Sequence, residues 1–187
     1  MTWWIPKKDW LQPPRLDDDL DYQAADAWAR EFTPEPGKEA YGIALEHAKR
    51  KYDEAVGHFD MLDKKADELM RTAVTIAALL VAAIRALDVE VSIWLVLALV
   101  FFLLTTIVAA ITRRPTLQAT PGSVHEVLGF VDDFRIRDRH QIEALVAASL
   151  RCAIVGTQLA IRWKSVQISR ATVMFVIGVV LVLPVFL

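Results

Sequence analysis

Residues 41–87, YGIALEHAKRKYDEAVGHFDMLDKKADELMRTAVTIAALLVAAIRAL, contain the pattern that decides the fold. Apolar or small residues recur in this stretch at alternating steps of three and four: Leu45, Ala48, Tyr52, Ala55, Phe59, Leu62, Ala66, Leu69, Ala73, Ile76, Leu80, Ala83 and Leu87. This spacing is typical of one helix face that packs against other helices, as in a coiled coil. The sequence therefore predicts a single long helix, which at about 1.5 Å per residue would extend for about 70 Å.

The residues outside this seam change character part-way along the stretch. Before Met70 they are largely charged, whereas after Arg71 they are Thr, Val, Ala, Ile and Leu. One helix is therefore expected to leave water and enter lipid without changing its packing seam. We assign the seam to self-association into a homo-oligomer, with these main contact residues: Leu45, Tyr52, Phe59, Leu62, Leu69 and Ile76.

Three stretches are apolar enough to cross a membrane. The first covers about 71–87 and has Arg71 and Arg85 near its ends, from where both side chains can reach the interfaces. The second covers about 91–111 and contains no charged residue. The third covers 171–187 and is likewise uncharged. A short connection joins the first two spans, so they are expected to form a tight hairpin in contact with membrane lipids.

The chain is expected to have four parts. Residues 1–37 form a Trp-rich, acidic cytoplasmic segment with a short helix, and residues 38–112 form the long amphipathic helix and the transmembrane hairpin. Residues 113–170 form cytoplasmic helices, and residues 171–187 form the third span. The predicted fold class is an all-α membrane protein with three transmembrane helices and long cytoplasmic amphipathic helices that form a bundle or stalk.

Two further packing faces are predicted in the cytoplasmic parts. A short helix from about Leu16 to Phe32 is expected to pack through Leu20, Ala24, Ala27 and Trp28. A long helix from Asp138 onward is expected to pack through a second seam at Ile142, Leu145, Ser149, Cys152, Gly156, Leu159, Trp163 and Val166.

Charge is distributed unequally along the chain. Residues 1–70 contain 10 basic and 16 acidic residues, a net charge of −6, whereas residues 112–170 contain 9 basic and 5 acidic residues, a net charge of +4. This asymmetry predicts two cytoplasmic parts that dock on each other, and it does not favour direct binding of nucleic acid. Basic residues precede the first and third spans and follow the second, which predicts a cytoplasmic N-terminus and an external C-terminus in a bacterial inner membrane.

Few residues indicate chemistry. The glycines form no phosphate-binding loop and no serine lies in a nucleophile elbow, so we expect no enzyme activity, no catalytic residues and no cofactor. His58, Asp60 and Asp63 are close on one helix, but neighbouring lysines favour an ion-paired surface over a metal site. Arg135 and His140 have the Arg-x4-His spacing seen in HEPN-type ribonucleases, which leaves a membrane-bound enzyme as an alternative.

The polar residues at the ends of, and inside, the first two spans are the candidate pore or membrane-interface residues. If the hairpins assemble as a ring, some of these residues would line its middle. Alternatively, the arginines reach the interfaces and the threonines bond to carbonyls of their own helices. The candidates are Arg71, Thr72, Thr75, Arg85, Thr105 and Thr106.

The run from Asp63 to Leu69, DKKADEL, leads directly into the first span and suggests a family. It resembles the Asp-x-Lys-Ala-x-x-Leu element of bacterial SLATT and Pycsar-type membrane effectors, with matches at Asp63, Lys65, Ala66 and Leu69. Lys164, shortly before the last span, is similar to a lysine of the Pycsar type.

This resemblance implies an inner-membrane effector of an antiphage, abortive-infection system. Such effectors oligomerise on a signal and impair membrane integrity or form a pore. No cyclic-nucleotide-binding domain is expected in these 187 residues, so sensing is assigned to a cytosolic partner or to residues 1–39. The alternative is a non-enzymatic membrane anchor or scaffold that recruits a cytosolic defence enzyme. Oligomer number, trigger and ion conduction do not follow from the sequence.

Overall fold

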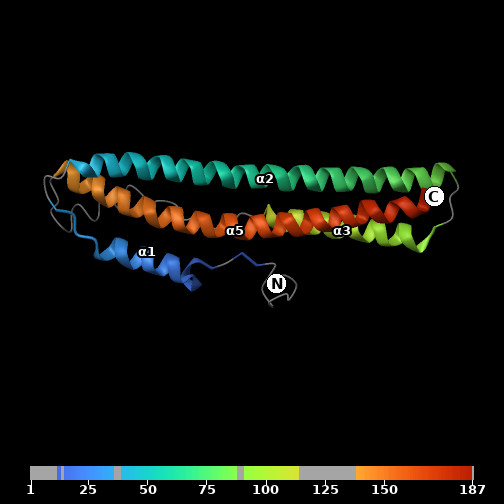
Figure 1. Cartoon of the computed structure of the whole chain (residues 1–187), viewed down its shortest axis with the longest axis horizontal. Coiled ribbons are helices and arrows are strands. Elements are labelled where there is room, and N and C mark those ends of the chain that lie inside the picture. Colours follow the sequence, from blue (N-terminus) through green and yellow to red (C-terminus); the bar gives the residue numbers. More distant parts are fainter. Residues whose placement is uncertain (1–11, 14, 36–38, 88–90, 114–137, 187) are drawn as a thin grey trace. The chain divides into compact units, whose positions relative to one another are not determined.

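The described part of the chain is all-helical. The computed structural model describes residues 12–13, 15–35, 39–87, 91–113 and 138–186, and these residues contain no strand. They form a short 3-10 turn and four α-helices (Figure 1): η1 (Leu16–Asp18), α1 (Leu20–Glu31), α2 (Ala40–Leu87), α3 (Ile93–Thr112) and α5 (Arg139–Phe186). The predicted all-α fold class is confirmed.

α2 contains the whole of the predicted seam and is helical through Met70 without interruption. Every seam position from Leu45 to Ala83 is buried or half-buried, whereas most of the residues between them are exposed. The predicted helix and its packing face are therefore confirmed. The seam is already covered within a single chain, so its role in self-association stays a prediction.

α1 begins later than the sequence predicts, and its packing face differs in part from the predicted one. The side chain of Asp19 caps the helix by accepting a hydrogen bond of 3.0 Å from the backbone N–H of Tyr22. The predicted face is wrong for Leu20, which is 79% exposed, and for the exposed Ala24 and Ala27, whereas Trp28 contacts α5 and Ala25, outside the predicted set, is buried. Alanines lie all around this helix, so tertiary contacts and not periodicity choose its buried side.

The chain divides into two compact units, and both long helices contribute to each. Unit 1 comprises Met1–Phe59 and Thr116–Arg162, and unit 2 comprises Asp60–Pro115 and Trp163–Leu187. Each unit therefore joins segments that are far apart in the sequence.

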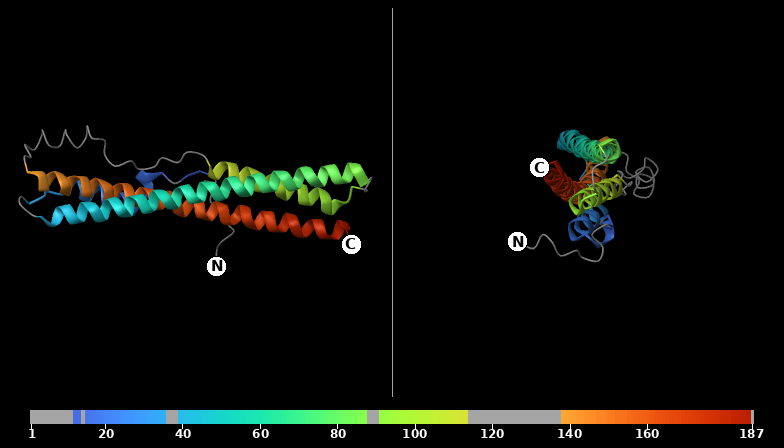
Figure 2. Two further views of the ribbon diagram at one scale, coloured as in Figure 1. Left: turned by 90° about the horizontal axis from the view of Figure 1, so that it is seen from above. Right: turned by 90° about the vertical axis from the view of Figure 1, so that its right-hand side faces the viewer.

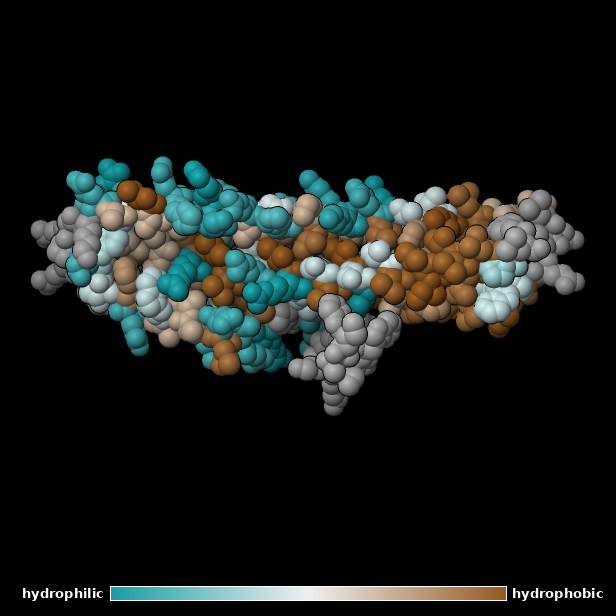
Figure 3. Space-filling view, viewed as in Figure 1, coloured by the Kyte–Doolittle hydropathy of each residue, from teal (hydrophilic) through white to brown (hydrophobic). Residues whose placement is uncertain are grey.

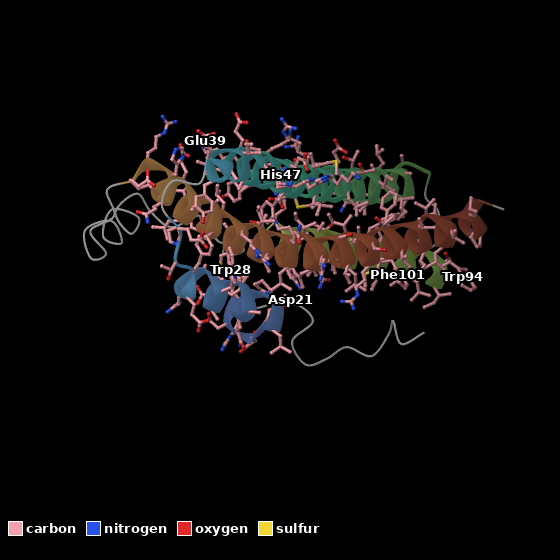
Figure 4. All side chains as sticks on the ribbon, turned by 60° about the vertical axis from the view of Figure 1, so that its left-hand side comes forward. Asp21, Trp28, Glu39, His47, Trp94 and Phe101 are labelled. Atoms are coloured by element: carbon pink, nitrogen blue, oxygen red, sulfur yellow. The ribbon has the colours of Figure 1, made fainter. Side chains whose placement is uncertain are left out.

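Unit 1 contains an aromatic contact between α1 and the long helices. The guanidinium of Arg151, on α5, lies 4.5 Å from the ring centroid of Trp28. Figure 4 shows Trp28 on α1. Trp28 in turn stacks at 4.9 Å on Phe32, whose ring meets Tyr41 of α2 at 6.4 Å. A cation–π contact of this kind stabilises a partly exposed site by about 0.5–1 kcal/mol, so α1 is held by modest contacts.

Unit 2 packs three helices around small and aromatic side chains. Its apolar core contains Ala73 and Leu80 of α2 together with Ala98 and Phe102 of α3. The ring of Phe102 also meets Phe175 of α5 at 5.7 Å in an edge-on arrangement. Figures 1 and 2 show α3 beside the C-terminal half of α5.

The surface of unit 2 around these helices is apolar. Val74 on α2, Leu103 on α3 and Val180 on α5 are each more than half exposed. Figure 3 shows this region covered by hydrophobic residues. Three helices are long and apolar enough to cross a membrane, namely Ala40–Ala86, Ile93–Thr112 and Arg139–Pro184. An apolar exterior on such helices suggests a membrane protein.

Candidate functional site: a buried ion pair and polar interior next to the spans

An ion pair between Lys164 and Asp63 joins α5 to α2 in unit 2. The ammonium Nζ of Lys164 donates to Oδ1 of Asp63, which lies 101 residues away in the sequence. The Lys164 side chain is only 1% exposed, whereas that of Asp63 is 33% exposed. A lysine is almost never fully buried unless it is paired. The pair is therefore the polar contact around which this end of unit 2 is organised.

The partner of Asp63 differs from the one expected. The sequence predicts an ion-paired surface of Asp63 with the neighbouring lysines, but Lys64 and Lys65 are exposed. Asp63 instead lies at the edge of the inward face of α2, next to Ala66, which is fully buried. Asp63 and Lys164 are thus brought together, while Lys65 is exposed.

Polar side chains continue from this pair into unit 2. Gln167, one helical turn after Lys164, is 1% exposed, and Thr105 and Thr112 of α3 are fully buried. The hydroxyl of Thr105 lies 3.5 Å from the carbonyl oxygen of Ala171, which sets the antiparallel register of α3 and α5. In that register Thr112 lies level with Lys164, so the polar positions follow one another along the interior.

One buried donor next to this interior lacks a partner. The indole Nε1 of Trp163 is buried and has no hydrogen-bond acceptor among the described residues. An unsatisfied buried donor costs about 1–3 kcal/mol, so the observed packing is less favourable here than a fully bonded one.

A second charged cluster lies where α2 and α3 meet at the ends of the predicted spans. Asp67 pairs with two arginines: its Oδ1 accepts a hydrogen bond from Nη1 of Arg113, and its Oδ2 forms an ion pair with Nε of Arg71, both at 2.8 Å. The i,i+4 geometry of Asp67 and Arg71 follows from helix periodicity, whereas Arg113 reaches Asp67 from the other arm of the hairpin.

The candidate pore residues are distributed over the surface and the interior. Of this set only Thr105 is fully buried, while Thr72, Thr75 and Arg85 are exposed and Arg71 has a side chain that is 77% exposed. The hydroxyls of Thr72 and Thr105 donate to carbonyls of their own helices at 2.7 and 2.8 Å. A single chain thus has the back-bonded arrangement named as the alternative, and the lining role stays a prediction.

Thr106 repeats this arrangement, since its hydroxyl donates to the carbonyl of Phe102 at 2.9 Å. The sequence interpretation did not single out Gln167 or Thr112. Gln167 could have been found from the spacing of α5. Ala160, Lys164, Gln167 and Ala171 recur at steps of four, three and four, the same alternation as in the α2 seam.

Unit 1 contains the titratable groups with displaced pKa values. Burial raises the pKa of the Cys152 thiol, which lies close to the side chain of Tyr22. The Arg139 guanidinium, which bonds Glu143 at 2.8 Å, lowers the pKa of that carboxyl. The first contact lies between α1 and α5, whereas the second lies within α5.

The alternative ribonuclease pair is only partly within the described residues. His140 Nδ1 lies 3.4 Å from Oε2 of Glu143, while Arg135 lies outside the described residues. Across the part of the chain that the structure describes, no group of three or more His, Cys, Asp or Glu side chains could hold a metal ion.

Comparisons of this chain with protein-family models, with curated proteins and with solved structures found no match, so its function has to be inferred from its own residues.

Proposed function

We propose that this chain is a bacterial inner-membrane effector of an antiphage system that oligomerises and impairs membrane integrity, or forms a pore, when a signal or a cytosolic partner triggers it. The observation that carries the proposal is the fully buried, ion-paired Lys164 at the membrane end of the predicted cytoplasmic helices, followed by buried Gln167 and by Thr105 inside the second span. Thr105 continues this polar row into the second span, and polar groups within a membrane bundle often line a path for ions or protons. A simple anchor requires only apolar spans.

The Asp63–Lys164 pair is the contact that would separate the resting and active states in this proposal. Removing one partner of a buried charged pair typically costs about 3–5 kcal/mol. A trigger that moves α5 away from α2 would have to supply that free energy. It would then expose Lys164 and Gln167 to an interior shared with other copies, in a two-state change of helix packing.

The resemblance to SLATT and Pycsar-type effectors supports the assignment to antiphage defence. It rests on Asp63, Lys65, Ala66, Leu69 and Lys164 and on the order of helix, hairpin and last span. The proposal carries no enzyme activity and assigns sensing to a cytosolic partner.

Dye leakage from liposomes tests this proposal. The full chain would be reconstituted into vesicles of phosphatidylethanolamine and phosphatidylglycerol that contain a self-quenched dye. We expect Asp63→Asn to raise leakage several-fold over the unmodified chain, because the variant releases Lys164 from its partner. Asp60→Asn is the matched control, because Asp60 is an exposed carboxylate on the same helix. Membrane potential in cells that express each variant gives the second measurement.

The two candidate functions predict different outcomes. The effector proposal is wrong if the folded Asp63→Asn variant leaves vesicles tight and cells polarised at every protein density. The threonines that bond to their own helices favour the alternative of a membrane anchor or scaffold. In that case a cytosolic enzyme would co-purify at fixed stoichiometry while no variant causes leakage.

A further inference from the structure

We propose that Arg71 and Arg113 form a binding site for the phosphate headgroup of an anionic phospholipid. The proposal concerns a different cluster from the Asp63–Lys164 pair. It requires that the hairpin lie in a membrane, but it does not require that the protein disrupt one.

The geometry points to a preformed site. The two oxygens of Asp67 bind one arginine each, at 2.8 Å, so a single carboxylate holds guanidiniums from α2 and α3 side by side. Only Nε of Arg71 and Nη1 of Arg113 take part in these bonds. A guanidinium has five N–H donors, so both retain donors suited to phosphate oxygens.

The charge balance of the cluster favours an anion. Two arginines share one carboxylate, and the side chains of Arg71 and Arg113 are 77% and 48% exposed, whereas that of Asp67 is 23% exposed. The cations therefore face outward and the carboxylate lies behind them. Among the neighbouring residues of α2, exposed Glu68 opposes this charge, and exposed Lys64 and Lys65 add to it.

The position of the cluster favours a lipid over a free anion. Arg71 immediately precedes the apolar part of α2, and Arg113 directly follows α3, which ends at Thr112. About one to two turns further into the spans, Val74 and Ile107 are 51% and 45% exposed. A headgroup on the two guanidiniums would thus have apolar side chains beside its acyl chains. Basic residues at such an interface each attract anionic lipid by about 1 kcal/mol.

Native mass spectrometry of the full chain, released from micelles that contain equal amounts of phosphatidylglycerol and phosphatidylcholine, tests the proposal. We expect the unmodified chain to retain phosphatidylglycerol preferentially. The Arg71→Gln/Arg113→Gln variant should lose this preference roughly 10- to 30-fold. Arg85→Gln, at the other end of the first span, removes one exposed arginine and should lower retention by no more than about fivefold, the effect of one interfacial basic residue.

Asp67→Asn separates a built site from general electrostatic attraction. This variant makes the cluster more positive but removes the carboxylate that holds the two guanidiniums together. We expect it to lower retention of phosphatidylglycerol. Higher retention would overturn the proposal, as would an equal loss in Arg85→Gln.

Inorganic phosphate at millimolar concentration is the remaining arm of the experiment. We expect the bound lipid to stay, because the acyl chains contribute to binding. Displacement of the lipid by inorganic phosphate would show a site for free anions and would overturn the assignment to a lipid. Circular dichroism of each variant confirms that the helices remain folded. Loss of lipid preference would leave the leakage experiment unaffected, so the two proposals can fail separately.

Discussion

The two members of the Asp63–Lys164 pair should respond very differently to neutralisation. Lys164 is almost completely buried, whereas a third of the Asp63 side chain is exposed. Asp63→Asn removes a carboxylate that pairs with a buried ammonium. Lys164→Met removes the buried charge, fills a similar volume and leaves a carboxylate that water can reach.

The expected magnitudes follow from this asymmetry. Removing one partner of a buried pair costs about 3–5 kcal/mol of stability. We expect Asp63→Asn to lower the free energy of unfolding by about 3 kcal/mol, because Asp63 is partly solvated in the folded protein. Replacing a buried ion pair by apolar residues of similar volume is often neutral or stabilising, so Lys164→Met should change stability by less than about 1 kcal/mol. The double variant Asp63→Asn/Lys164→Met should resemble Lys164→Met alone.

Unfolding in mixed micelles measures the difference. Helicity would be followed by circular dichroism while sodium dodecyl sulfate is added to the protein in a mild detergent. Asp60→Asn again serves as the control for loss of an exposed carboxylate from α2. Equal losses for Asp63→Asn and Lys164→Met, or a larger loss for Lys164→Met, would refute the view that burial of the lysine makes the pair essential.

Two further predictions concern the helix packing of each unit. A Cβ atom at Gly178 would lie 3.1 Å from the Phe102 ring, so Gly178→Leu should destabilise unit 2 by about 1–3 kcal/mol in the same unfolding experiment, whereas Val179→Leu, at an exposed position, should have little effect. The raised pKa of Cys152 predicts a low thiolate fraction at neutral pH and therefore slow labelling by a maleimide. The labelling rate should keep rising with pH above the pH at which an exposed thiol is already ionised. Ala25→Arg, which places a charge at the buried face of α1, should speed this labelling, and an unchanged rate would show that α1 does not cover Cys152.

Local periodicity in the sequence determined the helices and their environment. The α2 seam from Leu45 to Ala83 could be predicted because one side of a regular helix must recur every three to four residues. The spans could be predicted because an uncharged run of sufficient length has few other stable environments. Both features depend on neighbours in the sequence, so no knowledge of the partner helix was needed.

The contacts between helices depended on the tertiary structure. On α5 the expected seam is buried or half-buried except at Val166, which is 39% exposed, but an adjacent row with Lys164 and Gln167 is buried more completely. Both rows have helical spacing, so periodicity does not discriminate between them. On α1, periodicity likewise does not identify the buried side. The helix has several alanines, and only packing against other helices determines that Ala25 is the buried one.

The candidate sites show the same division. Asp63 has two lysines beside it in the sequence, yet its partner is Lys164, because that side chain lies on the buried row of α5 and a buried ammonium requires a carboxylate. Asp67 and Arg71 pair through helix geometry alone, whereas Arg113 joins them only because the hairpin brings its two arms together. The sequence by itself determined which residues are helical, charged or apolar. The packing of one helix on another decided which charges meet, because burial makes an unpaired charge costly.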